Sequence, residues 1–422
     1  MNDFAYKEDR LYCGDVAIED LADSVGTPFY CYSLPTIRRH VRVFEESLAG
    51  VDHQTCFAVK ANANLAVLAV LANMGIGADV VSGGELFKAL KAGMAPSRIV
   101  YSGVGKRVDE IDMALAAGIL MFNIESEQEL EVVATRASVL NKKAPVAIRV
   151  NPDVDPETHP YISTGLKENK FGIDIDAALE QYRKAVSFDH VDVIGLDCHI
   201  GSQLTEVKPF LDAVERLKVL VSRLEKDGIS LRYLDLGGGL GITYEHEEPP
   251  HPSEYGSAIV KTAGDLGMKL IFEPGRVIVG NAGILVSRVL YRKRTADKTF
   301  IIVDAGMNDL VRPAFYNAYH EISTVVKKNV GREKVDVVGP ICESSDFLAK
   351  DRELPQLDRG DLIAVMSAGA YGFTMASNYN SRPKPPEILV DKDKFYLVNK
   401  RQVYDDLTSG ETIPYAILKE GE

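Results

Sequence analysis

The sequence predicts an α/β fold: a (β/α)8 barrel followed by a second, mostly antiparallel β domain. Through the middle of the chain, short runs rich in Val, Ile and Phe alternate with amphipathic stretches of about 10 to 15 residues, a pattern typical of repeated strand–helix units. Eight such strands fall within about 250 residues, the number that a TIM-type barrel requires. The rhythm stops after Gly280. The strand count alone leaves a doubly wound open sheet as the alternative.

The barrel is expected to occupy residues 36–280 of the 422-residue chain. Its strands are predicted, in order, at Cys56–Lys60, Ala78–Val81, Ile99–Tyr101, Leu120–Ile124, Val146–Val150, Val193–His199, Tyr233–Leu236 and Lys269–Phe272. The amphipathic stretches between them predict helices at Gly84–Ala92, Val108–Ala117, Glu127–Leu140, Pro209–Lys226 and Ser253–Ala263, with another beginning near Ile175.

The β domain, a β-sandwich or β-barrel, is expected to comprise residues 281–422 together with residues 1–35. Its predicted strands, separated by Gly and Pro, are Lys298–Val303, Lys334–Val338, Leu362–Val365, Glu387–Val390 and Lys394–Val398. Two N-terminal strand patterns, Arg10–Val16 and Pro28–Tyr32, are expected to pair with these strands. The domain is therefore predicted to be discontinuous in sequence.

The composition excludes several classes of protein. Asp plus Glu is 61 against 48 for Lys plus Arg, and a net charge of -13 repels phosphate backbones and anionic lipids. The N-terminus lacks the layout of a secretion signal, and no apolar run reaches the roughly 20 residues of a membrane helix. Five cysteines without C-x-x-C spacing indicate a reducing compartment with no disulfide framework and no zinc site. We therefore expect a cytoplasmic protein without nucleic-acid, membrane or metal partners.

Chemically versatile residues follow four of the predicted strands. They are Lys60 in CFAVKANAN, His199 in GLDCHIGSQ, the glycines of LDLGGGLG (Gly237–Gly239) and the EPGR turn (Glu273–Arg276). In a barrel, reactive residues lie at the carboxyl ends of the strands. The sequence therefore predicts that these four sets share one rim.

Two of these sets suggest a bound anion and a covalent link. A lysine after an apolar strand is desolvated, loses its charge readily and can form a Schiff base with a carbonyl, although a lysine that reaches solvent or pairs with a carboxylate is the ordinary alternative. A glycine run late in a barrel exposes backbone N–H groups to an anion such as phosphate. A dinucleotide fingerprint or a plain tight turn explains three glycines equally well.

The other two sets suggest a flat ring cofactor. Glu273 facing a pyridine nitrogen would keep that nitrogen protonated, which makes the ring a stronger electron sink, whereas Glu273 and Arg276 could equally form a surface ion pair. His199 could stack on such a ring or be an ordinary buried histidine. The Pro- and Gly-rich segment from Asn151 to Gly172 is either a lid over the site or an exposed insertion.

Motifs along nearly the whole chain carry a family resemblance. FAVKAN, HIGSQ, GGGLG and EPGR resemble the alanine-racemase-like (fold type III) pyridoxal phosphate decarboxylases. DAGMNDLVRPAFY (Asp304–Tyr316), GPICESSD (Gly339–Asp346), AGAYG (Ala368–Gly372) and SNYNSRP (Ser377–Pro383) resemble the branch of that family that acts on diaminopimelate. The resemblance implies decarboxylation of meso-2,6-diaminopimelate to L-lysine and CO2, the last step of lysine biosynthesis, with pyridoxal 5'-phosphate as cofactor.

The resemblance also implies roles for individual residues. Lys60 would carry the cofactor and His199 would stack on its ring, while its phosphate and pyridine ends would be held by Ser202, Gly238, Gly239, Glu273, Pro274, Gly275, Arg276 and Tyr371, the last approaching from the β domain. The substrate would contact Arg276, Arg312, Tyr316, Glu343 and Tyr371. Cys342 would donate the proton, unless it is merely a buried apolar residue. Cys342 and Glu343 would come from the partner subunit of a homodimer.

The charges at the far end of the substrate favour diaminopimelate among the family's substrates. That end carries both an ammonium and a carboxylate, and Glu343 and Arg312 supply the two opposite signs. An ornithine- or lysine-type substrate would leave Arg312 unpaired. The alternatives are a sister decarboxylase, of the ornithine, arginine or carboxynorspermidine type, and a non-catalytic pyridoxal phosphate carrier, which would not need the β domain.

Overall fold

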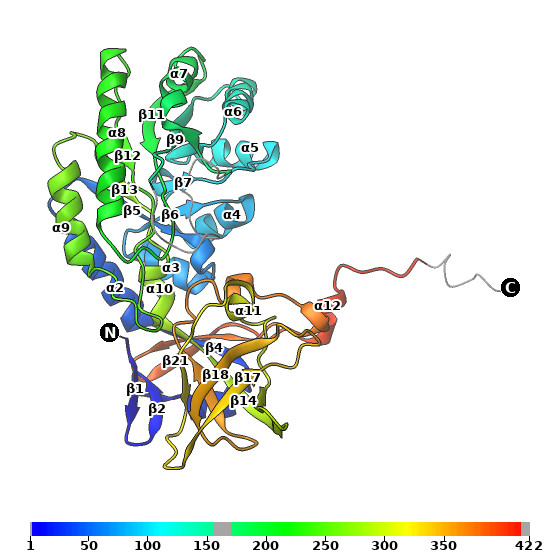
Figure 1. Ribbon diagram of the computed structural model, residues 1–422. Coiled ribbons are helices and arrows are strands. Elements are labelled where there is room, and N and C mark those ends of the chain that lie inside the picture. Colours follow the sequence, from blue (N-terminus) through cyan, green and yellow to red (C-terminus); the bar gives the residue numbers. More distant parts are fainter. Residues whose placement is uncertain (1, 155–169, 415–422) are drawn as a thin grey trace. The chain divides into compact units, whose positions relative to one another are not determined.

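The computed structural model describes residues 2–154 and 170–414, so most of the segment expected as a lid, Asn151–Gly172, lies outside the described residues. The chain divides into two compact units (Figure 1). The barrel unit contains Ser33–Gly283, Gly369–Thr374 and the first residues of the chain. The β unit contains Phe4–Tyr32, Ile284–Ala368 and the described residues from Met375 onward.

The barrel unit is built on a closed ring of eight parallel strands, so the open-sheet alternative is wrong. The ring runs through β5 (His53–Ala58), β6 (Gly77–Val80), β7 (Ile99–Tyr101), β8 (Met121–Ile124), β9 (Ala144–Asn151), β11 (Val191–Asp197), β12 (Tyr233–Asp235) and β13 (Lys269–Phe272), and β13 pairs with β5 to close it. The short β10 (Ile173–Asp174) adds to β9. The barrel prediction is confirmed, strand by strand.

Four barrel strands, β5, β6, β11 and β12, end one or two residues before their predicted ends. The difference at β5 concerns Lys60. β5 stops at Ala58, and Lys60 lies in the 3-10 turn η1 (Val59–Ala61) that follows it. The chain leaves the sheet there in a 3-10 turn, which the Asn62 N–H closes by bonding the Val59 carbonyl at 3.0 Å. Lys60 therefore follows the strand and is not part of it.

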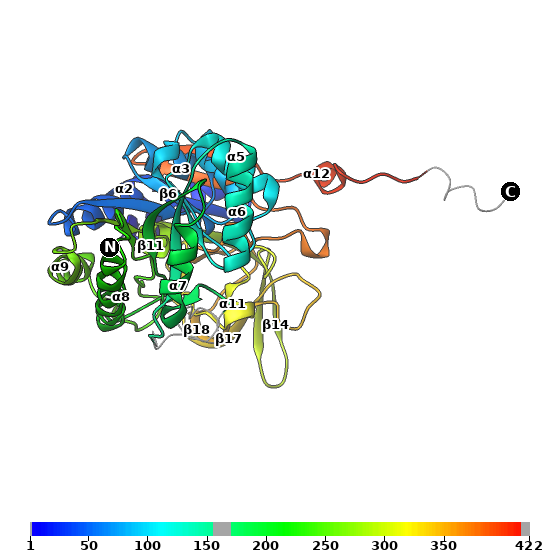
Figure 2. The same ribbon diagram turned by 90° about the horizontal axis from the view of Figure 1, so that it is seen from above.

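Helices surround the strands of the barrel unit (Figure 2). They are α2 (Leu34–Ser47), α3 (Leu65–Asn73), α4 (Gly83–Lys91), α5 (Val108–Ala117), α6 (Glu127–Val139), α7 (Ile175–Ala185), α8 (Lys208–Lys226), α9 (Pro252–Ala263) and α10 (Arg276–Val279). Side-chain caps fix several starts: Ser82 accepts from Glu85 N–H and Ser126 from Glu129 N–H. In the part of the chain that the structure describes, no helix is long and apolar enough to cross a membrane.

The β unit combines two sheets with a few short helices. Its elements are β1 (Phe4–Lys7), β2 (Arg10–Cys13), β3 (Val16–Ala17), α1 (Ile18–Val25), β4 (Phe29–Ser33), β14 (Gly283–Arg294), β15 (Thr299–Val303), α11 (Arg312–Tyr316), β16 (Ile322–Thr324), β17 (Arg332–Val338), β18 (Phe347–Pro355), β19 (Leu362–Val365), β20 (Glu387–Asp391), β21 (Lys394–Asn399) and α12 (Tyr404–Thr408). The N-terminal strand β4 lies between β14 and β20, as expected. The pattern at Arg10–Val16 instead forms β2 and β3, which make a separate three-stranded sheet with β1, so its expected pairing with the C-terminal strands is wrong. The large sheet is mixed, because β15 and β17 run parallel.

Candidate active site

The carboxyl ends of the barrel strands bring the expected residues of the barrel unit to one rim. Lys60 follows β5, His199 lies two residues after β11, and Glu273 follows β13 directly. Three residues that the sequence analysis did not select join them there: Asp79 near the end of β6, Asp197 as the last residue of β11 and Asp235 as the last residue of β12. The strand-end rule applies equally to Asp197 and Asp235, each of which ends its strand.

Lys60 forms an ion pair with Asp79. Its Nζ lies 2.6 Å from Asp79 Oδ2, and the Asp79 side chain is completely buried. Burial acts to lower the pKa of Lys60, but the negative charges of Asp79 and Glu273 outweigh it, so the pKa is raised above its ordinary value. The expectation of a lysine that loses its charge through desolvation is therefore wrong for the isolated chain, and the carboxylate-paired alternative describes what is seen.

Three carboxyl groups form a buried cluster beside that pair. The nearest oxygens of Asp197, Asp235 and Glu273 lie within 4.8 Å of one another. Burial, followed by the charge of its neighbour Asp235, raises the pKa of Glu273 well above its ordinary value, and burial raises that of Asp235 to about 6. Because three adjacent carboxylates cannot all ionise cheaply in a buried site, the cluster shares protons among its members.

Positive and polar groups surround the carboxyl cluster. Arg149 Nε lies 3.9 Å from Asp197, and Lys60 acts on Glu273 from the other side. Asn123 Nδ2 donates to Asp235 Oδ2 at 3.3 Å. These contacts offset part of the negative charge of the cluster.

The glycine run is wedged between His199 and Glu273. Gly238 N–H donates to His199 Nδ1 at 3.1 Å, and Glu273 N–H donates to the Gly237 carbonyl at 2.7 Å. A Cβ on Gly238 would lie only 2.2 Å from the Glu273 carbonyl oxygen. The next helix, α9, begins only at Pro252, whereas a dinucleotide fingerprint opens a helix directly, so that alternative is wrong.

The imidazole of His199 is neutral in this setting. Burial, followed by the positive charges of Arg149 and Lys60, lowers the pKa of His199 well below its ordinary value. Its Nδ1 accepts the Gly238 N–H, which fixes the ring against the glycine run. A neutral ring held at the rim is suited to stacking on an aromatic ligand.

Arg276 is buried at the start of α10, so the surface ion pair suggested for the EPGR turn is wrong. Its Nη2 donates to Ser202 Oγ at 2.9 Å and its Nη1 donates to the Tyr244 hydroxyl at 2.7 Å. The guanidinium carbon lies 4.8 Å from the centre of the Tyr371 ring. Tyr244 was not selected from sequence because it follows the glycine run in an irregular loop.

Tyr371 belongs to the barrel unit and not, as expected, to the β domain. Its segment, Gly369–Thr374, packs with the barrel, and Tyr371 N–H donates to the Ala61 carbonyl at 2.8 Å. Asn62 Nδ2 adds a bond of 3.1 Å to the Gly369 carbonyl. The φ angle of Tyr371 is +56°, an uncommon value for a tyrosine. These bonds hold the ring beside Arg276 in spite of that strained backbone.

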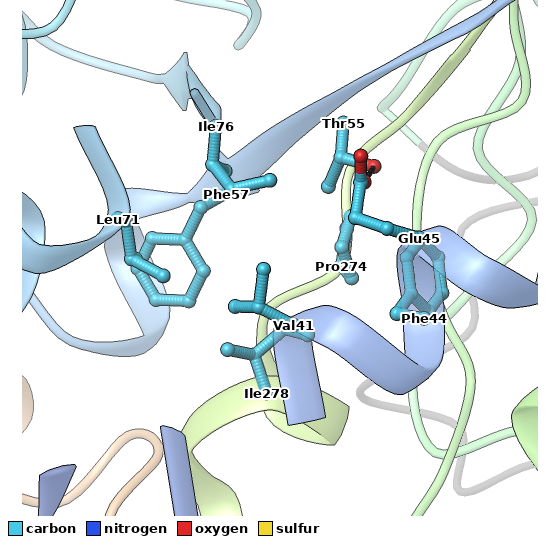
Figure 3. A pocket seen from close by; sticks show the side chains of 9 residues that line it. All are labelled: Val41, Phe44, Glu45, Thr55, Phe57, Leu71, Ile76, Pro274 and Ile278. Atoms are coloured by element: carbon cyan, nitrogen blue, oxygen red, sulfur yellow. Dashed lines mark hydrogen bonds between the residues drawn. The ribbon is translucent and has the colours of Figure 1, made fainter. Parts of the chain in front are cut away.

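Pro274 supports the EPGR turn by packing against neighbouring side chains. Its ring lines a small apolar pocket with residues of α2, α3, α10 and the barrel wall, namely Val41, Phe44, Glu45, Thr55, Phe57, Leu71, Ile76 and Ile278 (Figure 3). Side chains fill this pocket so closely that no water molecule fits. Pro274 therefore acts through packing, and Gly275 lets the turn approach Ala61, because a Cβ there would lie 2.9 Å from Ala61 Cβ.

The remaining selected residues lie in the β unit. Arg312 is buried at the start of α11, and the half-buried Tyr316 ends that helix. Cys342 and Glu343 are exposed on the loop between β17 and β18, so Cys342 is not the buried apolar residue of the alternative. Cys342 N–H donates to Asn380 Oδ1 at 2.7 Å.

Comparison with known proteins identifies the class that this fold and rim define. A family model described as "Pyridoxal-dependent decarboxylase, pyridoxal binding domain" matches residues 34–280, the range that contains all eight barrel strands. The barrel unit is thus the pyridoxal-binding domain of a pyridoxal-dependent decarboxylase.

Full-length relatives narrow the class further. The chain is 52% identical over 413 residues to the diaminopimelate decarboxylase of Pseudomonas aeruginosa, covering 98% of this chain and 99% of that protein. The diaminopimelate decarboxylase of M. jannaschii in complex with L-lysine superposes with a TM-score of 0.93 at 39% identity, over 98% of this chain and 99% of that one. The Helicobacter pylori enzyme complexed with L-lysine gives 0.90 at 44% identity, over 93% and 98%. The chain therefore belongs to the diaminopimelate decarboxylase family.

Proposed function

We propose that the chain catalyses the pyridoxal-phosphate-dependent decarboxylation of meso-2,6-diaminopimelate to L-lysine and CO2, the last step of lysine biosynthesis. The observation that carries the proposal is the set of residues at the carboxyl rim of the barrel. The chain that bears them is similar over nearly its full length to proteins named diaminopimelate decarboxylases. An amine, a buried carboxyl cluster and a glycine run meet there at the ends of β5, β12 and β13.

The rim residues fit pyridoxal phosphate. Three buried oxygens there, Asp79 Oδ1, Asn123 Oδ1 and Asp197 Oδ1, have no hydrogen-bond partner among the described residues, as expected where a polar ligand completes the network. Lys60 would hold the aldehyde carbon, and Glu273 the pyridine nitrogen. Ser202, Gly238, Gly239 and Arg276 would hold the phosphate. The bound group supplies an electron sink for the electron pair left when CO2 departs.

Residues of the chain itself would accept and donate the protons that the reaction moves. Asp79 lies 2.6 Å from Lys60 Nζ and is the nearest base for the proton that this amine must lose before it can bond to a carbonyl. Burial and the neighbouring carboxyl groups favour the protonated form of Glu273, so this residue would have a proton to supply to the ring nitrogen. Cys342 then delivers a proton to the carbon that has lost its carboxylate, so that a C–H bond replaces the C–C bond.

Charges select the substrate. Arg276, with the tyrosine that lies beside it, Tyr371, binds a substrate carboxylate in the barrel unit, and Arg312 with Tyr316 binds the carboxylate at the far end. Glu343 binds the distal ammonium. Because only one end of diaminopimelate reacts, the product lysine keeps the intact amino-acid end and its contact with Arg312.

The active form is a homodimer in which Cys342 and Glu343 serve the partner subunit's site. The exposure of both residues in the single chain supports this arrangement. All five cysteines are free thiols, which supports a cytoplasmic location.

The test is a product assay on purified protein supplied with pyridoxal phosphate. We expect lysine and CO2 in equal amounts from meso-diaminopimelate, and neither product with the Lys60→Ala variant. Faster CO2 release from ornithine, arginine or carboxynorspermidine would instead indicate a sister decarboxylase. A chain that binds the cofactor but releases no CO2 from any of these substrates would be a carrier.

A further inference from the structure

His320 is brought back beside Arg312 by a reversal of the chain. Helix α11 ends because Asn317 adopts a left-handed backbone, with φ of +51°. Ala318 N–H then bonds the Arg312 carbonyl at 3.3 Å, and His320 arrives next to the helix start just before β16 begins at Ile322. The loop thus places the imidazole against a guanidinium eight residues earlier in the chain.

The contacts of His320 determine its protonation. Its Nδ1 lies 2.8 Å from the Met366 carbonyl oxygen, and its Nε2 lies 2.9 Å from Arg312 Nη1. A carbonyl oxygen only accepts, so Nδ1 carries the hydrogen, and a guanidinium only donates, so Nε2 accepts. His320 is therefore neutral in this arrangement and gives Arg312 a hydrogen-bond acceptor without a counter-charge.

Burial and backbone hydrogen bonds hold His320 in place. His320 is completely buried, and its carbonyl accepts from Arg352 Nη1 at 2.8 Å. Met366, which binds the other side of the ring, directly follows β19 and donates its N–H to the Glu321 carbonyl at 2.8 Å. Because β16 and β19 pair with each other, the backbone that carries His320 and the residue that holds its Nδ1 are tied to the same sheet.

We propose that His320 is a positioning residue that orients Arg312 toward the distal carboxylate of the substrate. The inference rests on the proposed function, and it adds the residue that orients Arg312. An arginine loses much side-chain entropy when it is fixed, and carboxylate recognition depends on the plane of the guanidinium. A neutral acceptor fixes that plane without adding a negative charge that would compete with the substrate carboxylate.

Two substitutions test the two hydrogen bonds of the His320 imidazole separately. In His320→Asn the side-chain amide can still donate to Met366 but no longer reaches Arg312, whereas in His320→Gln the longer amide can still accept from Arg312. The readouts are kcat and KM for meso-diaminopimelate and the inhibition constants of lysine and cadaverine. Lysine keeps the carboxylate that Arg312 would bind, and cadaverine has none.

We expect His320→Asn to raise the KM for diaminopimelate and the inhibition constant of lysine by about tenfold, the loss typical of one hydrogen bond to a charged group. The kcat and the inhibition by cadaverine should stay within about twofold of wild type, and His320→Gln should resemble wild type throughout. Unchanged constants in His320→Asn, or equal losses for lysine and cadaverine, would overturn the proposal. If His320→Asn does not fold, a tenfold rise in the KM of His320→Gln for diaminopimelate would overturn the proposal. A wild type that makes no lysine would instead refute the proposed function.

Discussion

Lys60 Nζ and Asp79 Oδ2 lie 2.6 Å apart, with the carboxylate completely buried and the lysine side chain about one-third exposed. The buried partner sets the position of the amine, while the exposed part leaves it within reach of a ligand. Positive charge on Lys60 in turn stabilises the acidic cluster below it. The charge balance of the rim therefore depends on pairs of residues from different strands.

Replacing Arg312 should change the choice of substrate more than the chemistry. Arg312→Ala removes the cation proposed to bind the distal carboxylate, and the loss of a buried charge-assisted contact is expected to raise the KM for diaminopimelate at least about tenfold. The preference for diaminopimelate over lysine or ornithine should fall with it. Steady-state kinetics on the three amino acids measures both effects.

A control arginine is available in the same unit. Arg292 forms a partly exposed ion pair with Glu333, so Arg292→Ala should leave all kinetic constants near wild type. An unchanged preference in Arg312→Ala would contradict the role assigned to Arg312.

At the scale of the elements, the glycine run shows how a loop can fix a site without side chains. The run lies between the loops that follow β11 and β13, with Gly238 N–H bonded to His199 and the Gly237 carbonyl bonded to Glu273 N–H. The site residues of two strands are thus held together through the backbone of a third.

An added methyl group should disrupt this arrangement. In Gly238→Ala the new Cβ would lie 2.2 Å from the Glu273 carbonyl oxygen, and the backbone shift that relieves the clash should cost about 1–3 kcal/mol of stability. The visible absorbance of bound pyridoxal phosphate should fall together with the melting temperature. Gly105→Ala is the matched control, because a Cβ there meets nothing within 4 Å.

Local patterns in the sequence predict the eight barrel strands because each is a short apolar run bounded by turn residues. They miss α3, since Leu65–Asn73 is apolar on nearly all sides and lacks a helical period. They also miss β14, which is buried along its first half and exposed along its last four residues, so it never alternates regularly.

The same reasoning finds Lys60, His199 and Glu273 in the candidate site but not Asp79, Tyr244 or His320. Asp79 lies inside an apolar strand pattern, so its position reads as structural. Tyr244 and His320 act through contacts with arginines 32 and 8 residues away, which no local pattern reveals. Side chains that support other side chains emerge only from the packed structure.

For the whole molecule, the proposed dimer makes a prediction about mixtures of inactive variants. Lys60→Ala lacks the amine and Cys342→Ala lacks the proton donor, so each protein alone should have little activity. If the sites are shared, mixing them lets hybrid dimers form one complete site. Random exchange in equal amounts should then restore up to about a quarter of the wild-type activity.

That mixture is measured by the rate of lysine formation after subunit exchange. A parallel mixture of Lys60→Ala with Glu273→Ala, two residues of the same barrel unit, should recover nothing, because no hybrid would contain a complete barrel site. Failure of the first mixture to recover would show that Cys342 does not act across subunits.

The central claim is that Lys60 binds pyridoxal phosphate, and chemical reduction of the loaded protein tests it most directly. Borohydride fixes the cofactor on the amine that holds it, and mass spectrometry of the digested chain then identifies the labelled lysine. The account predicts one pyridoxyl group, on the peptide containing Lys60, and none on that peptide when the protein is reduced without the cofactor. A label on another lysine, or none at all, would contradict it.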